Sequence, residues 1–139
     1  MAAPIEDYAI LSNCRTAALV SREGSIDWLC LPRYDSPSIF GALLGEQKHG
    51  HWTIRAADPD ATVTRYYEDD TFVLVTRWET PTGVAEVREF MPIDGGRVEL
   101  VRRVEGKLGG NSAESRIGGL LLRADLRHHP PPAHHVHRE

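Results

Sequence analysis

Cysteine, basic charge and long apolar runs are all scarce in this sequence, and each shortage excludes a class of protein. The 139 residues contain only two cysteines, Cys14 and Cys30, so we expect no disulfide framework and two reduced thiols. No apolar run reaches the ~18–20 residues of a membrane span, and Glu6 and Asp7 stand where a signal peptide would carry basic residues. With 16 Lys and Arg against 20 Asp and Glu, the chain lacks the basic excess of a nucleic-acid-binding protein. These shortages predict a cytoplasmic chain with no nucleic-acid or membrane partner.

Aromatic residues are absent from the last third of the chain, because all of them lie between Tyr8 and Phe90. The stretch 107–139 is instead rich in Gly, Arg, Pro and His, and most of the histidines stand near its end. Such a composition has little to bury against the entropy of ordering it. We therefore predict a folded domain at residues 1–106 and an aberrant, poorly ordered tail at 107–139. Within the tail, only residues 119–126 are apolar enough to form a short element.

Short strand patterns separated by turns dominate residues 1–106 and predict an all-β fold. The expected strands are residues 17–20 and 25–31, which form a hairpin, and residues 51–56, 62–67, 71–80, 84–91 and 98–104. The sequence also predicts one short helix, with Ser36 as its cap and Gly45 at its end. The apolar face of that helix would comprise Ile39, Phe40, Leu43 and Leu44. This arrangement is typical of an antiparallel β-sandwich.

Motifs that hold nucleotides, zinc or a nucleophilic serine are missing as well. Neither GxGxxG nor GxxxxGK[ST] occurs, no GxSxG motif is present, and the cysteines lack CxxC spacing. His49 and His51 would face the same side of a strand and could bind a metal, but without a third ligand a polar strand edge is the favoured interpretation. The histidines at 128–137 would bind metals only loosely, because a proline-rich tail supplies no fixed geometry. We therefore expect no cofactor and no metal site.

The segment 24–37 carries the densest chemical information in the chain. Its candidate sugar-binding residues are Trp28, Arg33, Tyr34 and Asp35. Carbohydrate sites combine aromatic rings that stack on sugars with charged groups that bond hydroxyls, and these four residues supply both. In the alternative, Trp28 is a core residue and Arg33 pairs with Asp35 to brace the loop. Composition alone favours the alternative.

Residues 4–106 resemble one known family over almost their whole length. The resemblance rests on PIEDYAIL at 4–11, NCRTAALV at 13–20 and GSIDWLCLPRYDSPSIFGALLG at 24–45, followed in the same order by HGHWTI, TRYYEDDTFVLVTRWET, GVAEVREFMP and LVRRVEG. These segments are similar to the amino-terminal domain of glycoside hydrolase family 15, the bacterial and archaeal glucoamylase-like and trehalase-like enzymes. The resemblance implies a large, many-stranded β-sandwich that is followed, in family members, by a catalytic toroid of paired α-helices.

The resemblance stops near Gly106, where family members continue with more strands, a linker and the toroid. We therefore expect a truncated sandwich, and the abrupt change of composition predicts a reading-frame shift or a misannotated gene end in GC-rich DNA. Inverting glycosidases use two carboxyl groups about 6.5–9.5 Å apart. In this family both are glutamates of the toroid, so no catalytic residue is assigned in this chain. The resemblance leaves the segment from Trp28 to Asp35 as a candidate rim of the sugar pocket in an intact parent.

Three functions stay open at this point. The first is a non-catalytic N-terminal fragment, inactive alone, of an enzyme that hydrolyses α-glucosidic bonds of trehalose or maltooligosaccharides by inversion. Its partners would be a catalytic toroid and a glucose-containing oligosaccharide. The second is a free-standing carbohydrate-binding or protein-interaction module. A metal-handling protein that uses the histidine tail is the least favoured.

Overall fold

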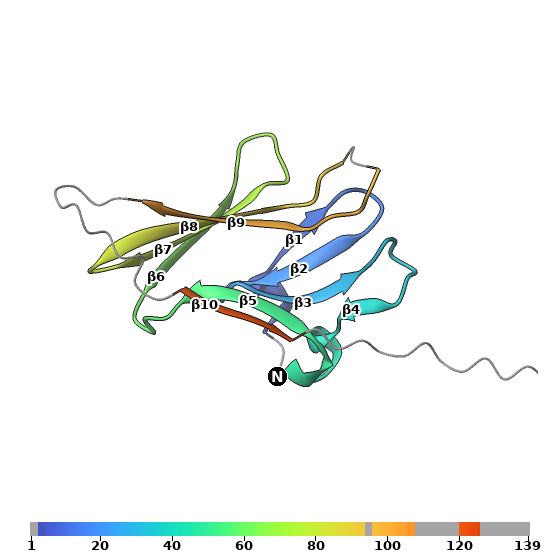
Figure 1. The fold of residues 1–139 in the computed structure, drawn as a ribbon, viewed down its shortest axis with the longest axis horizontal. Helices are drawn as coiled ribbons and strands as arrows, with labels where there is room; N and C mark the ends of the chain where they lie inside the picture. Colours follow the sequence, from blue (N-terminus) through green and yellow to red (C-terminus); the bar gives the residue numbers. More distant parts are fainter. Residues whose placement is uncertain (1–2, 94–95, 108–119, 126–139) are drawn as a thin grey trace, which may run out of the picture.

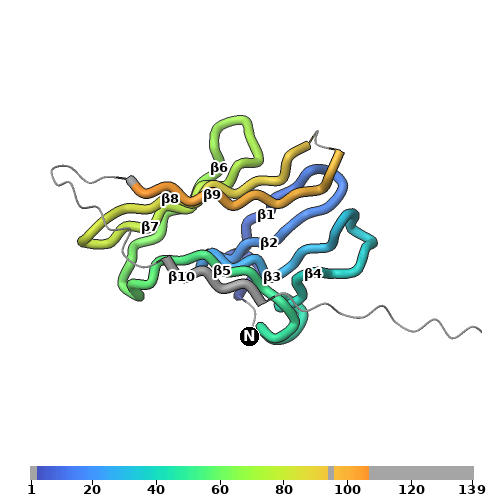
Figure 2. Tube along the Cα trace, viewed as in Figure 1, coloured from blue at the N-terminus to red at the C-terminus, as the bar shows by residue number. Residues whose placement is uncertain are grey.

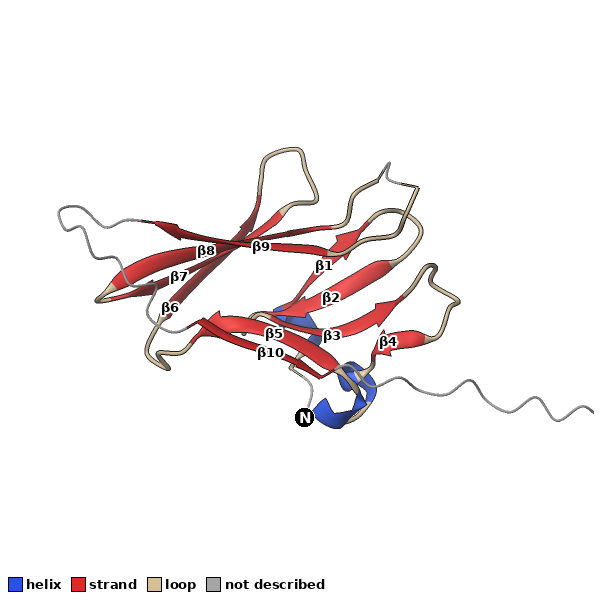
Figure 3. Cartoon of the chain, in the orientation of Figure 1, coloured by secondary structure: helices blue, strands red, loops and turns tan. Residues whose placement is uncertain are grey.

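The computed structural model describes residues 3–93, 96–107 and 120–125. The strands are β1 (Tyr8–Ser12), β2 (Ala17–Ser21), β3 (Ser25–Cys30), β4 (Ser38–Phe40), β5 (His51–Ala56), β6 (Thr62–Tyr67), β7 (Leu74–Thr80), β8 (Gly83–Phe90), β9 (Val101–Lys107) and β10 (Leu120–Asp125). Three short 3₁₀ helices accompany them, η1 (Ile5–Asp7), η2 (Ala42–Leu44) and η3 (Gln47–His49), as Figure 3 shows. Among these described elements, no helix has the length and apolar character that a membrane crossing requires.

Two antiparallel sheets form two layers, as Figure 1 shows. Sheet A has the strand order β1-β2-β3-β5-β10, with β4 paired to β3, and sheet B has the order β6-β7-β8-β9. The chain runs through β1 to β5 in the first layer before it crosses to the second layer for β6 to β9 (Figure 2). Strand β10 then pairs with β5 of the first layer. The all-β sandwich predicted from the sequence is confirmed.

The core lies between the two sheets and is built from alternate residues of the strands. Its main cluster comprises Ala9, Leu11, Ala18, Val20, Ile26, Leu29 and Phe40 of sheet A together with Leu74 and Met91. A second cluster joins Ile54 of β5 to Trp78 and Val87 of sheet B. Each fully buried large apolar side chain contributes roughly 1.5–3 kcal/mol. Burial between the sheets is therefore the main force that holds the layers together.

The short helix predicted between Ser36 and Gly45 is wrong in its first half. Ser38–Phe40 forms strand β4, in which Phe40 lies opposite Leu29 of β3. Only Ala42–Leu44 is helical, as the single turn η2. The physical reason is tertiary, because pairing with β3 satisfies the backbone and buries Phe40 in the core, while the side chain of Leu44 is left 77% exposed. The apolar face expected on one helix is therefore divided between a strand and a turn.

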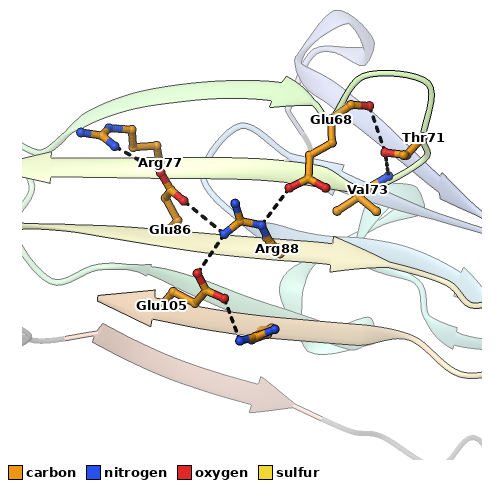
Figure 4. A network of polar contacts seen from close by, with 8 residues as sticks. Glu68, Thr71, Val73, Arg77, Glu86, Arg88 and Glu105 are labelled. Atoms are coloured by element: carbon orange, nitrogen blue, oxygen red, sulfur yellow. Dashed lines mark hydrogen bonds and ion pairs between the residues drawn. The ribbon is translucent and has the colours of Figure 1, made fainter. Parts of the chain in front are cut away.

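The outer face of sheet B carries a ladder of ion pairs, seen in Figure 4. Arg88 of β8 bonds Glu68 at 2.9 Å, Glu105 of β9 at 3.0 Å and Glu86 at 3.2 Å. Arg77 of β7 pairs with the same Glu86 at 3.1 Å. The pairs of Arg77 with Glu86 and of Arg88 with Glu105 therefore link β7 to β8 and β8 to β9 across the sheet. Such partly exposed pairs contribute little individually, but they give this face a polar character that suits water.

The predicted tail, 107–139, contains one described element beyond the end of β9. Strand β10 (Leu120–Asp125) falls within residues 119–126, where the sequence allowed a short element, and it pairs with β5 from Leu120 opposite Ala56 to Asp125 opposite His51. The predicted poor order of the remaining tail concerns residues outside those the structure describes.

Candidate functional site

The loop after β3 holds Arg33 and Asp35 in a bidentate ion pair. The guanidinium Nε and Nη2 atoms donate to the two carboxylate oxygens at 2.9 and 2.7 Å. Both side chains are largely exposed. The hydrogen bonds between them raise the pKa of Arg33 and lower the pKa of Asp35, because each ion is stabilised by its partner. This pairing is the bracing role that the composition favoured.

Tyr34 lies between these two residues and is tied to the β1–β2 turn. Its backbone N–H donates to the Arg15 carbonyl at 3.1 Å, and its hydroxyl lies 3.3 Å from the Ser12 hydroxyl. The predicted helix cap, Ser36, instead accepts the Arg33 backbone N–H at 3.1 Å within the loop. With its side chain 60% exposed, Tyr34 therefore presents a ring on a loop of fixed shape.

Trp28 lies on β3 and belongs to neither buried cluster of the described residues. The β2–β3 register shifts between Leu19 and Val20, so that Trp28 lies opposite Leu19 while Ile26 lies opposite Val20. The extra residue, Asp27, is accommodated by this bulge, which re-aims the side chains around it. The core position proposed for Trp28 in the alternative interpretation is therefore not what the structure shows. Within the described ranges, no hydrogen bond or ring contact joins Trp28 to the loop residues.

Asp27 is the centre of a hydrogen-bonded chain that the sequence reasoning missed. The Tyr8 hydroxyl donates to one carboxylate oxygen at 2.6 Å, and the Ser25 hydroxyl donates to the other at 2.5 Å. Thr53 of β5 donates in turn to the Ser25 hydroxyl at 3.1 Å. Burial, and then the bond to Asp27, raise the pKa of Tyr8 to about 12. The i, i+2 spacing of Ser25 and Asp27 on a strand was a usable signal, but the partner Tyr8 comes from a strand not adjacent to β3.

A fully buried ion pair of sheet B was also missed, and its arginine contacts the opposite layer. Arg102 of β9 and Glu89 of β8 are 2.6 Å apart, and both side chains have 0% exposure. The Arg102 guanidinium also donates to the carbonyls of Trp52 at 2.6 Å and Gly24 at 2.7 Å, both in the opposite layer. Its carbon lies 5.1 Å from the centre of the Trp52 ring, within cation–π range. We call this group the inter-sheet clamp.

Burial acts on both ions of the inter-sheet clamp. It raises the pKa of Glu89 despite the opposing charge of Arg102, and it lowers the pKa of Arg102. The alternation of residues along the strand could have revealed that Arg102 points inward, because it falls between Leu100 and Val104 on the core side. An inward arginine predicts a buried acceptor, but its partner could be found only in the fold.

The two histidines considered as a metal pair do not share a strand. His49 belongs to η3, where its ring Nδ1 lies 2.9 Å from the Glu46 backbone N–H. His51 begins β5 and is buried, with its Nδ1 3.0 Å from the Gln47 carbonyl. The prediction that both face one side of a strand is therefore wrong. Over residues 3–93, 96–107 and 120–125, no group of three potential ligands could hold a metal ion.

The fold places the chain in the class of antiparallel β-sandwich domains. Among the residues that the structure describes, the Arg33–Asp35 pair braces a loop and the inter-sheet clamp links the two layers. The family described as "Trehalase-like, N-terminal" matches residues 1–113, and the chain belongs to that family. The matched range extends past Gly106, where the resemblance was expected to stop.

Comparison with curated proteins gives similar relatives. The chain is 43% identical over 86 residues to a trehalase of Mycolicibacterium smegmatis and 42% identical over 86 residues to one of Mycobacterium tuberculosis. It is 38% identical over 104 residues to Trehalase 1 of Sulfolobus acidocaldarius. These alignments cover 62%, 62% and 75% of this chain but only 13%, 12% and 18% of the relatives, so the chain spans a small part of their length. No solved structure matches significantly.

Proposed function

We propose that this chain is a non-catalytic N-terminal domain of a trehalase-like member of glycoside hydrolase family 15. The proposed intact form hydrolyses an α-glucosidic bond, in trehalose or in maltooligosaccharides, by inversion. The family match over residues 1–113 carries the proposal. It is supported by the small share, 12–18%, that the chain covers of three similar trehalases. A cytoplasmic location and a reading-frame shift remain predictions from the sequence.

The chemistry of inversion supports a catalytic part outside this domain. It needs one carboxylic acid to protonate the leaving oxygen and one carboxylate to activate water, with room for that water between them. The most buried acid described, Glu89, is held 2.6 Å from Arg102 and has no exposed side-chain surface. Glu89 therefore serves the fold and is not available to a substrate. We propose that both catalytic carboxyl groups lie on a separate helical toroid.

The outer face of sheet A is the surface that we propose packs on this toroid. Ile10, Leu19 and Trp28 occupy paired positions across β1, β2 and β3. This apolar row differs from the outer face of sheet B, which is covered by ion pairs such as Arg88 with Glu105. Apolar surface suits a protein contact, and the charged face suits water. Packing through sheet A would bring the neighbouring loop with Tyr34 to the rim of a sugar pocket.

A chimera tests the proposal directly. Residues 1–106 of this chain would replace the homologous region of the Mycolicibacterium smegmatis trehalase, and glucose release from trehalose and maltose would be measured. We expect hydrolysis by the chimera and none by the isolated chain. Robust glucose release by the purified chain alone, with contaminating hydrolases excluded, would contradict the proposed division of roles.

The rim role of the loop is tested in the same chimera. Tyr34→Ala should raise KM several-fold with little change in stability, because the removed ring is 60% exposed. Tyr66→Ala, which removes a ring that is 45% exposed on the outer face of sheet B, is the matched control and should leave KM unchanged. Equal effects of the two variants would exclude a specific role of Tyr34.

A further inference from the structure

A hollow of about 610 Å³ opens between the β2–β3 turn and the connection from β5 to β6. Its charged walls come from the N-terminal segment with Asp7, the turn with Arg22 and Glu23, strand β3 with Asp27, and the connection that begins after Arg55. The η2–η3 segment, with Ala42, Gly45 and Gln47, and the sheet B residues Val63 and Trp78 complete the lining. Its volume falls in the range of roughly 300–1,000 Å³ that is usual for small-molecule sites. None of the candidate sugar-binding residues from the loop after β3 lines it.

The β2–β3 turn, which forms one wall, is held rigidly. Gly24 adopts φ +77°, and a Cβ at this position would lie 2.2 Å from the Ile54 carbonyl oxygen. The Gly24 carbonyl accepts the Ile54 N–H at 3.0 Å and the Arg102 guanidinium of the inter-sheet clamp at 2.7 Å. Arg22 and Glu23 therefore project from a turn that is fixed to both layers. A wall that is already ordered lowers the entropic cost of binding a ligand.

The charges around the hollow are arranged in pairs of opposite sign. Arg22 lies 3.1 Å from Asp7, and Arg55 lies 3.9 Å from Glu23. Each pair leaves guanidinium N–H donors and carboxylate acceptors for further hydrogen bonds. Asp27 is held by two hydroxyl donors, Tyr8 and Ser25, and adds a fixed acceptor. Donors and acceptors side by side match the hydroxyl groups of an uncharged ligand, because each hydroxyl can both donate and accept a hydrogen bond.

The net negative charge of the lining favours uncharged ligands over acidic ones. Carboxylates outnumber guanidinium groups in the lining, because Asp7, Glu23, Asp27 and Asp58 face only Arg22 and Arg55. A phosphorylated or acidic sugar would meet this excess of negative charge and be repelled. A neutral compound has no such penalty, and it can both donate to the carboxylates and accept from the guanidinium groups.

We propose that this hollow binds a small neutral polyhydroxylated compound, of monosaccharide to disaccharide size. The site lies within the domain itself and is separate from any catalytic groups on a toroid, so it goes beyond the function proposed above. If no sugar binds in the hollow, the result of the chimera experiment is unaffected. If the chimera is inactive, the binding test of the hollow is equally unaffected.

Amide chemical-shift titration of the 139-residue chain with trehalose, maltose and glucose tests the site. We expect saturable shifts confined to residues 21–25 and 55–61, and no comparable shifts with glucose 6-phosphate. Asp27→Asn and Arg55→Ala should each weaken binding by about tenfold, since each removes a charge-assisted hydrogen bond. Arg103→Ala, a surface arginine of β9 that is exposed and does not line the hollow, is the matched control and should bind as the parent does.

The amide spectrum of each variant shows whether it is folded. If either Asp27→Asn or Arg55→Ala fails to fold, the other still tests the site. The absence of saturable shifts with all three neutral sugars would overturn the proposal. Shifts centred elsewhere, for example on the loop at 31–37, would overturn it as well. Equal binding of glucose and glucose 6-phosphate would contradict the selection for uncharged ligands.

Discussion

The inter-sheet clamp shows how much one pair of side chains can decide in this protein. Arg102 and Glu89 are both fully buried, and Arg102 also satisfies two carbonyls of the opposite sheet. A buried ion pair is not in itself a large gain, because desolvation offsets the attraction between the charges. Removing one partner is different, since the other charge is then left buried without compensation. The clamp therefore contributes mainly by making a specific packing of the two layers obligatory.

Arg102→Met should destabilise the domain by about 3–5 kcal/mol, because Glu89 would be left as an unpaired buried acid. The free energy of unfolding from urea titration measures the change. Arg103→Met, at the neighbouring and largely exposed position on the same strand, is the control and should cost less than about 1 kcal/mol. A double change of Arg102 and Glu89 to Met should recover part of the loss. Equal losses for Arg102→Met and Arg103→Met would contradict the clamp.

Gly24 is a residue at which both conformation and space require glycine. Its φ is +77°, and a Cβ would lie 2.2 Å from the Ile54 carbonyl oxygen. Gly24→Ala should therefore destabilise the domain by more than about 1 kcal/mol in thermal or urea unfolding. Gly96 provides a matched control, because its φ is +65° but nothing lies within 4 Å of its Cβ position. If Gly96→Ala costs as much as Gly24→Ala, the close contact with Ile54 is not the cause.

The raised pKa of Tyr8 predicts that the domain loses stability at alkaline pH. Its pKa is raised from 10.0 in the unfolded chain to about 12 in the folded domain, so the folded state retains the hydroxyl proton longer. The contribution is therefore fully present below pH 10 and is lost as pH rises toward 12. Tyr8→Phe should flatten the fall of unfolding free energy over this range, and urea titrations of the parent and the variant at a series of alkaline pH values measure the change. Identical pH profiles for the parent and Tyr8→Phe would contradict the raised pKa of Tyr8, which burial and then the bond to Asp27 cause.

At the scale of elements, the segment after the loop at 31–37 shows tertiary contacts overriding a local pattern. Ser36, Pro37 and Gly45 are good signals for a short helix. The chain instead uses Ser38–Phe40 as a strand, because β3 offers unpaired backbone groups at that edge and the core has room for Phe40. Three residues of strand satisfy those groups more completely than one isolated helical turn, whose nucleation is unfavourable.

The strand at Ser38–Phe40 and a helix at the same place would respond differently to substitution. Phe40→Ala should destabilise the domain by about 3–5 kcal/mol, because the Phe40 side chain is only 4% exposed. Leu44→Ala should cost less than about 0.5 kcal/mol, since Leu44 is 77% exposed. Unfolding by urea, followed by circular dichroism, measures both. Losses of similar size at the two positions would favour the single apolar helix face that the sequence predicted.

At the scale of the whole molecule, the two outer faces of the sandwich differ in kind. Sheet B faces outward with paired charges, while the outer face of sheet A presents the row of Ile10, Leu19 and Trp28. A third surface lies at the end of the β6–β7 hairpin, where Tyr67 and Phe72 form an edge-to-face pair with ring centres 6.1 Å apart. Both Phe72 and Ile93 border a groove there and are exposed. We call this groove the hairpin groove.

Exposed apolar surface of this kind favours association between copies. The double change of Phe72 and Ile93 to Ser should reduce concentration-dependent self-association of the isolated domain in sedimentation experiments. Its effect on stability should be small, since both side chains are more than half exposed. Val87→Ser, a buried change, is the contrasting control and should lower stability instead. Unchanged association in the double variant would show that the hairpin groove is not the contact.

Alternation of apolar and polar residues was enough to locate most of the strands, because a pleated strand places every second side chain on the core side. The hairpin of 17–20 with 25–31, and the strands near 51–56, 62–67, 71–80 and 84–91, are therefore confirmed within a few residues. The same pattern could not show which strands pair with one another or in which register. The bulge at Asp27 and the use of Ser38–Phe40 as a strand depend on which strand lies alongside.

The candidate residues divide in the same way. Arg33 and Asp35 are two residues apart, so their pairing could be foreseen from the sequence, and it is seen. The bond from Tyr8 to Asp27, the clamp of Arg102 and Glu89, and the hollow beside the β2–β3 turn join residues from distant parts of the chain. The sequence by itself determined the all-β class and the family, because local alternation and ordered motifs are properties of neighbours along the chain. Only the tertiary structure decided which buried charges meet, because electrostatic and hydrogen-bond partners are set by distance in space.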